Sequence, residues 1–141
     1  MPRYLHSLLL SLLLLVAAAC STKEVPKPTP SLEGIWVQTR MTEYVPCSNC
    51  TTQRFIQDIN YPAGVQTLTI TPNEYKFNTA QGTNTFSYVR RGDTLLITVP
   101  LASGSITSRT SIINLKPSSL HLQQYAPRAG TSAIIDQYFT R

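Results

Sequence analysis

Two of the three cysteines in this chain of 141 residues have a spacing that permits cysteine chemistry. Cys47 and Cys50 lie in the segment Pro46-Cys47-Ser48-Asn49-Cys50. In an oxidising compartment they would form a short disulfide that closes a turn, worth about 2 kcal/mol through loop entropy. The same spacing also suits a thiol redox site at a helix start, or part of a zinc site. A structural disulfide is the preferred interpretation, because no long helical pattern follows and other zinc ligands are scarce.

The third cysteine, Cys20, ends an apolar run that covers residues 8–19. Arg3 precedes the run and small residues end it, which is the three-part pattern of a secretory signal peptide. The run is shorter than the ~20 residues of a membrane-spanning helix. Its ending, Ala17-Ala18-Ala19-Cys20, resembles the lipobox of bacterial lipoproteins, with alanine at 17 where that family usually has leucine. The resemblance implies cleavage between Ala19 and Cys20 and attachment of fatty acyl chains, palmitate among them, to Cys20.

Removal of residues 1–19 would leave 122 residues, which is the length of one domain. The net charge would fall from +5 to +4, because Arg3 is the one charged residue removed. The remaining basic residues are scattered, and Arg90-Arg91 is the only adjacent pair. A nucleic-acid-binding protein usually has a basic stripe or patch, so nucleic acid is not an expected partner.

A Pro-rich segment separates the predicted lipid site from the rest of the chain. Residues 21–31 contain three prolines that alternate with polar residues, which favours an extended spacer. At ~3.1 Å per residue, these eleven residues could reach about 34 Å. We therefore divide the chain into a signal peptide (1–19), a lipidated cysteine with its tether (20–31), and a folded domain (32–141).

The folded domain shows the period-two pattern of β-strands, because short runs alternate between apolar and polar residues and are rich in β-branched and aromatic types. The predicted strands cover residues 34–41, 67–71, 74–78, 86–88, 94–99, 111–115, 120–123 and 134–139. Short turns between them predict antiparallel hairpins. About eight strands in one antiparallel meander predict an all-β domain that closes into a barrel, with an open or sandwiched sheet as the alternative. Residues 52–59 are the best helical candidate, although they also fit a strand or a single turn.

Several motifs in this domain resemble those of a known family. Leu32-Glu33-Gly34-Ile35-Trp36 resembles the Gly-x-Trp opening of lipocalins. The order of the later motifs resembles the small lipocalin-like lipoproteins of Bacteroidetes-type bacteria: the pair Tyr75 and Phe77, then Gly92-Asp93-Thr94-Leu95, then an aromatic final strand that ends in Arg141. The resemblance implies a barrel closed at one end by Trp36, with Gly34 beside it. It also implies that Arg141 covers the Trp36 ring through a cation–π contact worth ~0.5–1 kcal/mol.

Four aromatic residues, Tyr75, Phe77, Phe86 and Tyr88, are predicted to face the same side of adjoining strands. In a filled barrel they would form part of the hydrophobic core. In a hollow barrel they would line a ligand cavity, with the tyrosine hydroxyls available for hydrogen bonds. Alternation alone does not choose between a filled and a hollow barrel.

The sequence does not contain a recognisable set of catalytic residues. The carboxylates are spread singly, and no nucleophile motif or phosphate-binding loop is present. His121 is expected on the solvated face of a strand. We therefore expect a binding protein and not an enzyme, without metal or cofactor, held by its lipid at the bacterial cell envelope, on the outer membrane. Its partner would be a small hydrophobic ligand or an envelope protein. The alternatives are a structural or assembly partner of envelope proteins without a ligand, and a thiol redox protein that uses Cys47 and Cys50.

Overall fold

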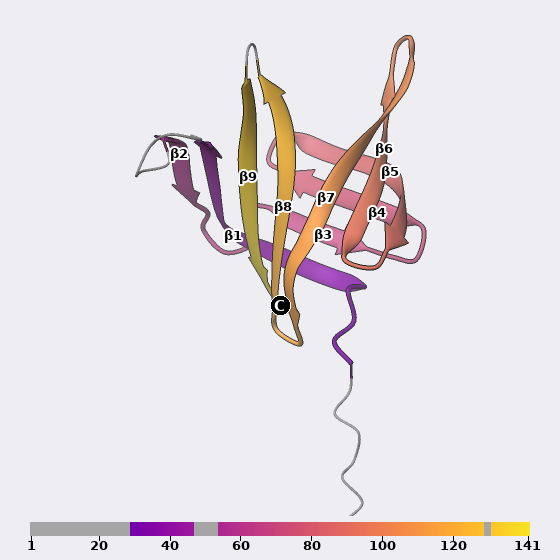
Figure 1. The fold of residues 1–141 in the computed structure, drawn as a ribbon. Coiled ribbons are helices and arrows are strands. Elements are labelled where there is room, and N and C mark those ends of the chain that lie inside the picture. The colour runs from indigo at the N-terminus through magenta and orange to yellow at the C-terminus, as the bar shows by residue number, and fades with distance from the viewer. Residues whose placement is uncertain (1–28, 47–53, 129–130) are drawn as a thin grey trace, which may run out of the picture.

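The computed structural model describes residues 29–46, 54–128 and 131–141 of the chain (Figure 1). The described part forms nine β-strands: β1 (Gly34–Val45), β2 (Arg54–Asn60), β3 (Thr67–Ile70), β4 (Glu74–Thr79), β5 (Gly82–Arg91), β6 (Thr94–Leu101), β7 (Gly104–Lys116), β8 (Ser119–Arg128) and β9 (Thr131–Thr140). The predicted signal peptide and most of the predicted tether lie outside these ranges. Within them, no helix is long and apolar enough to cross a membrane.

Eight of the strands form a closed antiparallel barrel. β1 pairs with β3, each strand from β3 to β8 pairs with the next along the chain, and β9 returns to pair with β1 (Figure 1). Closure pairs most strand edges, which is how an antiparallel meander protects its backbone hydrogen-bonding groups. The predicted all-β barrel is confirmed, and its architecture is compatible with the lipocalin-like fold that the resemblance implies.

The ninth strand, β2, shares one edge of β1 with β3. β1 pairs with β3 over Gly34–Val37 and with β2 over Arg40–Val45. Two more backbone hydrogen bonds join β1 to the segment between β2 and β3: Gln38 N donates to Gln66 O, and Tyr61 N donates to Thr39 O. Residues 54–60 therefore form a strand, which is one of the alternatives predicted for residues 52–59. This strand forms because of a tertiary contact. β1 is much longer than β3, and β2 pairs with the part of the β1 edge that β3 does not reach.

The hydrophobic core lies inside the barrel, on the face where alternation places the apolar side chains. Leu68 with Ile70 and Leu120 with Leu122 face inward, as their spacing predicts. The core consists of the following buried residues: Leu32, Trp36, Leu68, Ile70, Tyr75, Leu95, Ile97, Ile112, Leu120, Leu122 and Phe139.

The barrel has two different ends. In an antiparallel meander, alternate turns lie at the same end. We call the end with the β3–β4, β5–β6 and β7–β8 turns, together with Gly34 and Arg141, the base. We call the end with the β4–β5, β6–β7 and β8–β9 turns the mouth. The base is closed over the buried Trp36, whereas β7 and β8 are not paired with each other at the mouth.

Candidate functional site

The base is sealed by Trp36 and Arg141. The Trp36 side chain is fully buried, and its Nε1 donates a hydrogen bond of 2.8 Å to the carbonyl oxygen of Leu32. The Arg141 guanidinium carbon lies 4.1 Å from the Trp36 ring centroid. Arg141 also donates to the carbonyl oxygens of Pro117 (2.6 Å), Glu33 (3.0 Å) and Ser31 (3.1 Å). Arg141 at the end of β9 therefore connects the β7–β8 turn to the segment before β1, above the Trp36 indole.

Gly34 is required by this seal. Its φ of +136° lies in a region that favours glycine, and a Cβ at this position would lie 2.9 Å from Arg141 Nη1. The glycine of the Gly-x-Trp motif thus makes room for the arginine that covers the tryptophan.

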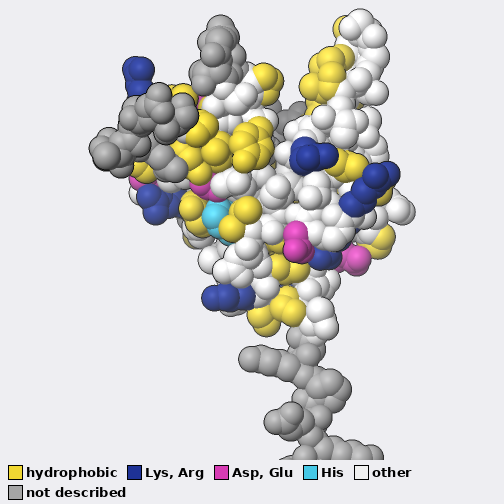
Figure 2. Space-filling model, viewed as in Figure 1, with side chains coloured by type: hydrophobic (Ala, Val, Ile, Leu, Met, Phe, Trp, Pro, Cys, Tyr) yellow, Lys and Arg dark blue, Asp and Glu magenta, His cyan; other side chains and the backbone are white. Residues whose placement is uncertain are grey.

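The mouth is open because two strands part. β7 and β8 pair from Lys116 and Ser119 up to Thr110 and Gln124, and beyond that point each strand continues with its other neighbour alone. The β6–β7 hairpin therefore projects away from the β8–β9 hairpin (Figure 1). Figure 2 shows the surface hollowed between these two hairpins. The opening gives access to the inner face of the barrel from solvent.

On β7, the inward-facing side chains near the mouth are exposed or only partly buried, in contrast to those nearer the base. Ser108 lies opposite the buried Ile97 yet is itself half-buried. Ile106, one inward position farther along β7, is 53% exposed. Half-exposed side chains on the inner wall of a barrel form a surface that a small ligand could cover.

The four predicted aromatic residues divide between the core, the mouth side and the base. Tyr75 is buried in the core, and burial raises the pKa of its phenol well above the ordinary value, so the group stays neutral. Phe77 and Phe86 are partly buried and pack against the core. Tyr88 lies toward the base, where its hydroxyl donates to the carbonyl oxygen of Thr71 at 2.8 Å. Tyr75 therefore belongs to the core cluster, and the other three residues pack against it.

Polar side chains occupy the middle of the inner wall. Thr110 and Gln38 are fully buried, and among the described residues the hydroxyl of Thr110 and both amide atoms of Gln38 have no hydrogen-bond partner. Glu43 is also buried, and its Oε2 accepts a hydrogen bond of 2.7 Å from Gln57 Nε2. Buried polar groups normally have partners, so Gln38 and Thr110 stand out as groups with unused hydrogen-bonding capacity.

Replacing Gln38 by methionine is expected to raise the free energy of unfolding by about 1–3 kcal/mol, because it removes an unpaired buried amide and keeps a similar volume. Urea unfolding of both proteins measures the difference. Gln81→Met, at an exposed turn, is the control and should change little. A loss of stability in Gln38→Met would contradict the prediction and show that the amide has a polar partner in solution.

The outer wall of β8, β9 and β1 carries a second polar cluster. His121 Nε2 lies 2.8 Å from Asp136 Oδ1, and Gln123 Nε2 donates to the same oxygen at 3.0 Å. The His121 ring stacks on Tyr138, with centroids 4.3 Å apart. Asp136 is only 6% exposed. The burial of Tyr44, and secondarily the negative charge of Asp136, raise the pKa of the Tyr44 phenol.

This cluster corrects one expectation. His121 was expected in solvent, but its side chain is 21% exposed and bound to a buried carboxylate. Asp136 lies on the adjacent strand and is far from His121 in the sequence, so no local spacing could reveal the pair. Of the described residues, only Asp136 hydrogen-bonds the His121 ring, and no group of three potential metal ligands occurs among them. The pair fastens β8 to β9 on the outer wall.

The three cysteines, Cys20, Cys47 and Cys50, lie outside the described residues, as does Ala19 at the predicted cleavage site. Lipid attachment, signal cleavage and the disulfide therefore remain predictions from sequence.

In comparisons with known proteins, no protein-family model, curated protein or solved structure matches the chain.

Proposed function

We propose that this chain is a lipid-anchored protein of the bacterial cell envelope whose lipocalin-like barrel binds a small, mainly apolar ligand through the mouth. The observation that carries the proposal is the parting of β7 and β8 above Thr110 and Gln124, which exposes inward-facing side chains. A filled barrel with no binding role would be expected to close this seam and bury its inner wall at both ends.

The lining of the mouth supports the choice of ligand class. On the inner wall toward the mouth, Ile106 is exposed and Phe77 and Phe86 are partly buried. Farther in, Thr110 carries a fully buried hydroxyl with no partner among the described residues. Small-molecule sites typically combine an apolar lining with a few polar groups that orient the ligand. A compact apolar molecule with one or two hydrogen-bonding groups fits this combination.

The anchor follows from the sequence pattern around Cys20. A cysteine that carries two or more acyl chains is held stably at a membrane, whereas a single chain is marginal. Residues 21–31 would then act as the tether. The first strand begins only three residues after this segment, so the tether leads directly to the base of the barrel.

Blocking the mouth tests ligand binding. Ser108→Phe places a ring on the inner wall, and Arg109→Phe places the same ring on the next, exposed residue as the matched control. The neutral probe N-phenyl-1-naphthylamine can be followed by energy transfer from Trp36, the only tryptophan. We expect Ser108→Phe to raise the Kd about tenfold or more, equivalent to about 1.4 kcal/mol, and Arg109→Phe to leave it within about twofold. Equal affinities in the two variants, or no binding by the unmodified chain, would contradict the proposal.

A second candidate is a structural or assembly partner of envelope proteins. Phe55 on β2 and Tyr125 on β8 are 61% and 57% exposed, and the strand register places both in one row across the outer wall, with Tyr44 and Ile134 between them. Figure 2 shows hydrophobic side chains together on this face of the molecule. Exposed aromatic side chains are common in protein interfaces. Native mass spectrometry of the extracted protein separates the two candidates: a small co-purifying molecule favours the first and a protein complex favours the second.

The redox alternative is a separate proposal that depends on Cys47 and Cys50. A Cys50→Ala variant that traps a mixed disulfide with another protein would support it. A Cys47 thiol pKa near its ordinary value of about 8.5 in the reduced protein would count against it.

A further inference from the structure

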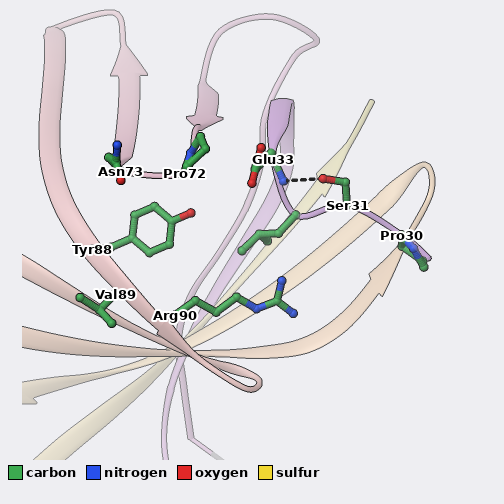
Figure 3. A pocket seen from close by; sticks show the side chains of 9 residues that line it. Pro30, Ser31, Glu33, Pro72, Asn73, Tyr88, Val89 and Arg90 are labelled. Carbon is green, nitrogen blue, oxygen red and sulfur yellow. Dashed lines mark hydrogen bonds between the residues drawn. The ribbon is translucent and has the colours of Figure 1, made fainter. Parts of the chain in front are cut away.

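A pocket lies at the base of the barrel, at the opposite end from the mouth (Figure 3). Its volume is about 480 Å³, which is within the usual range for small-molecule sites. Three segments far apart in the sequence enclose it: the residues before β1, the β3–β4 turn and the end of β5. The lining residues are Pro30, Ser31, Leu32, Glu33, Pro72, Asn73, Tyr88, Val89 and Arg90.

This base pocket contains one acidic and one basic side chain that do not neutralise each other. Glu33 and Arg90 both line it, and Figure 3 shows them on different sides of it. No ion pair joins them within 4.0 Å, and the Glu33 carboxylate accepts no hydrogen bond from the described residues. Arg90 Nε donates to the carbonyl oxygen of Gly92 at 2.9 Å, which orients the side chain and leaves both Nη groups available.

Tyr88 gives the base pocket an ordered aromatic wall. Its hydroxyl is held by the carbonyl oxygen of Thr71. Burial, followed by the charge of Glu33, raises the pKa of the Tyr88 phenol, whereas Arg90 lowers it. Both charges are therefore near enough to Tyr88 to act on it from within one pocket. Val89 and Leu32 add apolar surface beside these groups.

We propose that the base pocket binds a small zwitterion, with the ligand ammonium against the Glu33 carboxylate and its phosphate or carboxylate against the Arg90 guanidinium. The reason is complementarity: two opposite charges separated by an open space are both neutralised by a ligand that carries both signs. A guanidinium suits a phosphate or carboxylate because it offers two parallel donors. A simple cation or anion would satisfy only one side of the pocket.

Two sources could supply this chemistry. One is a free molecule such as a phosphorylated aminoalcohol, and the other is the same group at the head of a phospholipid. The second source fits the position of the base pocket, because Pro30 lines it and also lies in the segment that leads to the predicted lipid site. The zwitterion proposal itself does not depend on the anchor or on binding at the mouth.

Calorimetric titration of the purified full chain tests the proposal with O-phosphoethanolamine as the probe. Glu33→Gln and Arg90→Gln should each raise the Kd about tenfold, which is typical of losing a charge-assisted contact. Glu74→Gln and Arg91→Gln are the matched controls, since both residues are exposed and neither lines the pocket, and each should change the Kd by less than about twofold. Inorganic phosphate should bind more weakly than the probe and should respond to Arg90→Gln but not to Glu33→Gln.

A second titration, with dihexanoylphosphatidylethanolamine below its micelle concentration, distinguishes the sources. Binding with the same dependence on Glu33 and Arg90 supports a lipid headgroup, whereas binding of O-phosphoethanolamine alone supports a free ligand. If neither probe gives binding heat at millimolar concentration, the zwitterion site is overturned. An equal loss of affinity for O-phosphoethanolamine in Arg90→Gln and Arg91→Gln would also overturn it. Glu33→Gln and Arg90→Gln should not change the binding of N-phenyl-1-naphthylamine at the mouth. A failure of the base-pocket proposal is therefore distinguishable from a failure of the mouth proposal.

Discussion

Replacing Trp36 by alanine is expected to lower the free energy of unfolding by about 3–5 kcal/mol, the cost typical of removing a large aromatic side chain from a core. Trp36 is fully buried and belongs to the hydrophobic core of the barrel. Loss of the indole also leaves the Leu32 carbonyl without its donor and the Arg141 guanidinium without its ring. Chemical unfolding followed by circular dichroism measures the change.

Two variants separate the contributions to this loss. Trp36→Phe keeps an aromatic ring but removes the hydrogen bond to Leu32, so it should cost less than Trp36→Ala. Arg141→Met removes the guanidinium but keeps much of the aliphatic length. It loses the cation–π contact, worth about 0.5–1 kcal/mol at an exposed site, together with the hydrogen bonds to the base carbonyl oxygens. A loss below about 1.5 kcal/mol in Trp36→Ala would contradict the central role of Trp36, because it falls short of the usual cost for a core aromatic residue.

Replacing Cys20 by alanine is expected to move the protein from the membrane fraction to the soluble fraction when the full chain is expressed in a bacterium that processes lipoproteins. Each buried methylene of an acyl chain contributes about 0.8 kcal/mol to membrane binding, so loss of the chains removes the anchor as a whole. Cell fractionation measures the distribution, and intact mass shows whether the acyl chains and the signal peptide are present.

Cys47→Ala and Cys50→Ala are the matched controls, because each removes a sulfur but keeps Cys20. Both variants should remain in the membrane fraction. Retention of Cys20→Ala at the membrane, or an uncut precursor in the soluble fraction of the unmodified chain, would contradict lipid anchoring.

The strands could be predicted where alternation was strong and local. Thr67–Ile70 and Thr94–Leu101 form within one or two residues of the predicted limits, since their apolar residues face one side and turn residues bound them. The predicted 86–88 run was too short: β5 covers Gly82–Arg91, and apart from Val89 its remaining residues are glycine or polar. The strand Arg54–Asn60 forms because it completes the edge of β1, and that edge is not visible in a local pattern.

By itself, the sequence determined the all-β class and the inward face of the strands, because both depend on period-two alternation, which is a local property. The position of the Gly-x-Trp segment at one end of the barrel was implied by the resemblance to lipocalins. Tertiary structure alone decided that β7 and β8 part at the mouth, that His121 meets Asp136, and that Glu33 and Arg90 share one pocket. Each of these depends on which distant strands become neighbours and on their register, and no single stretch of sequence contains that information.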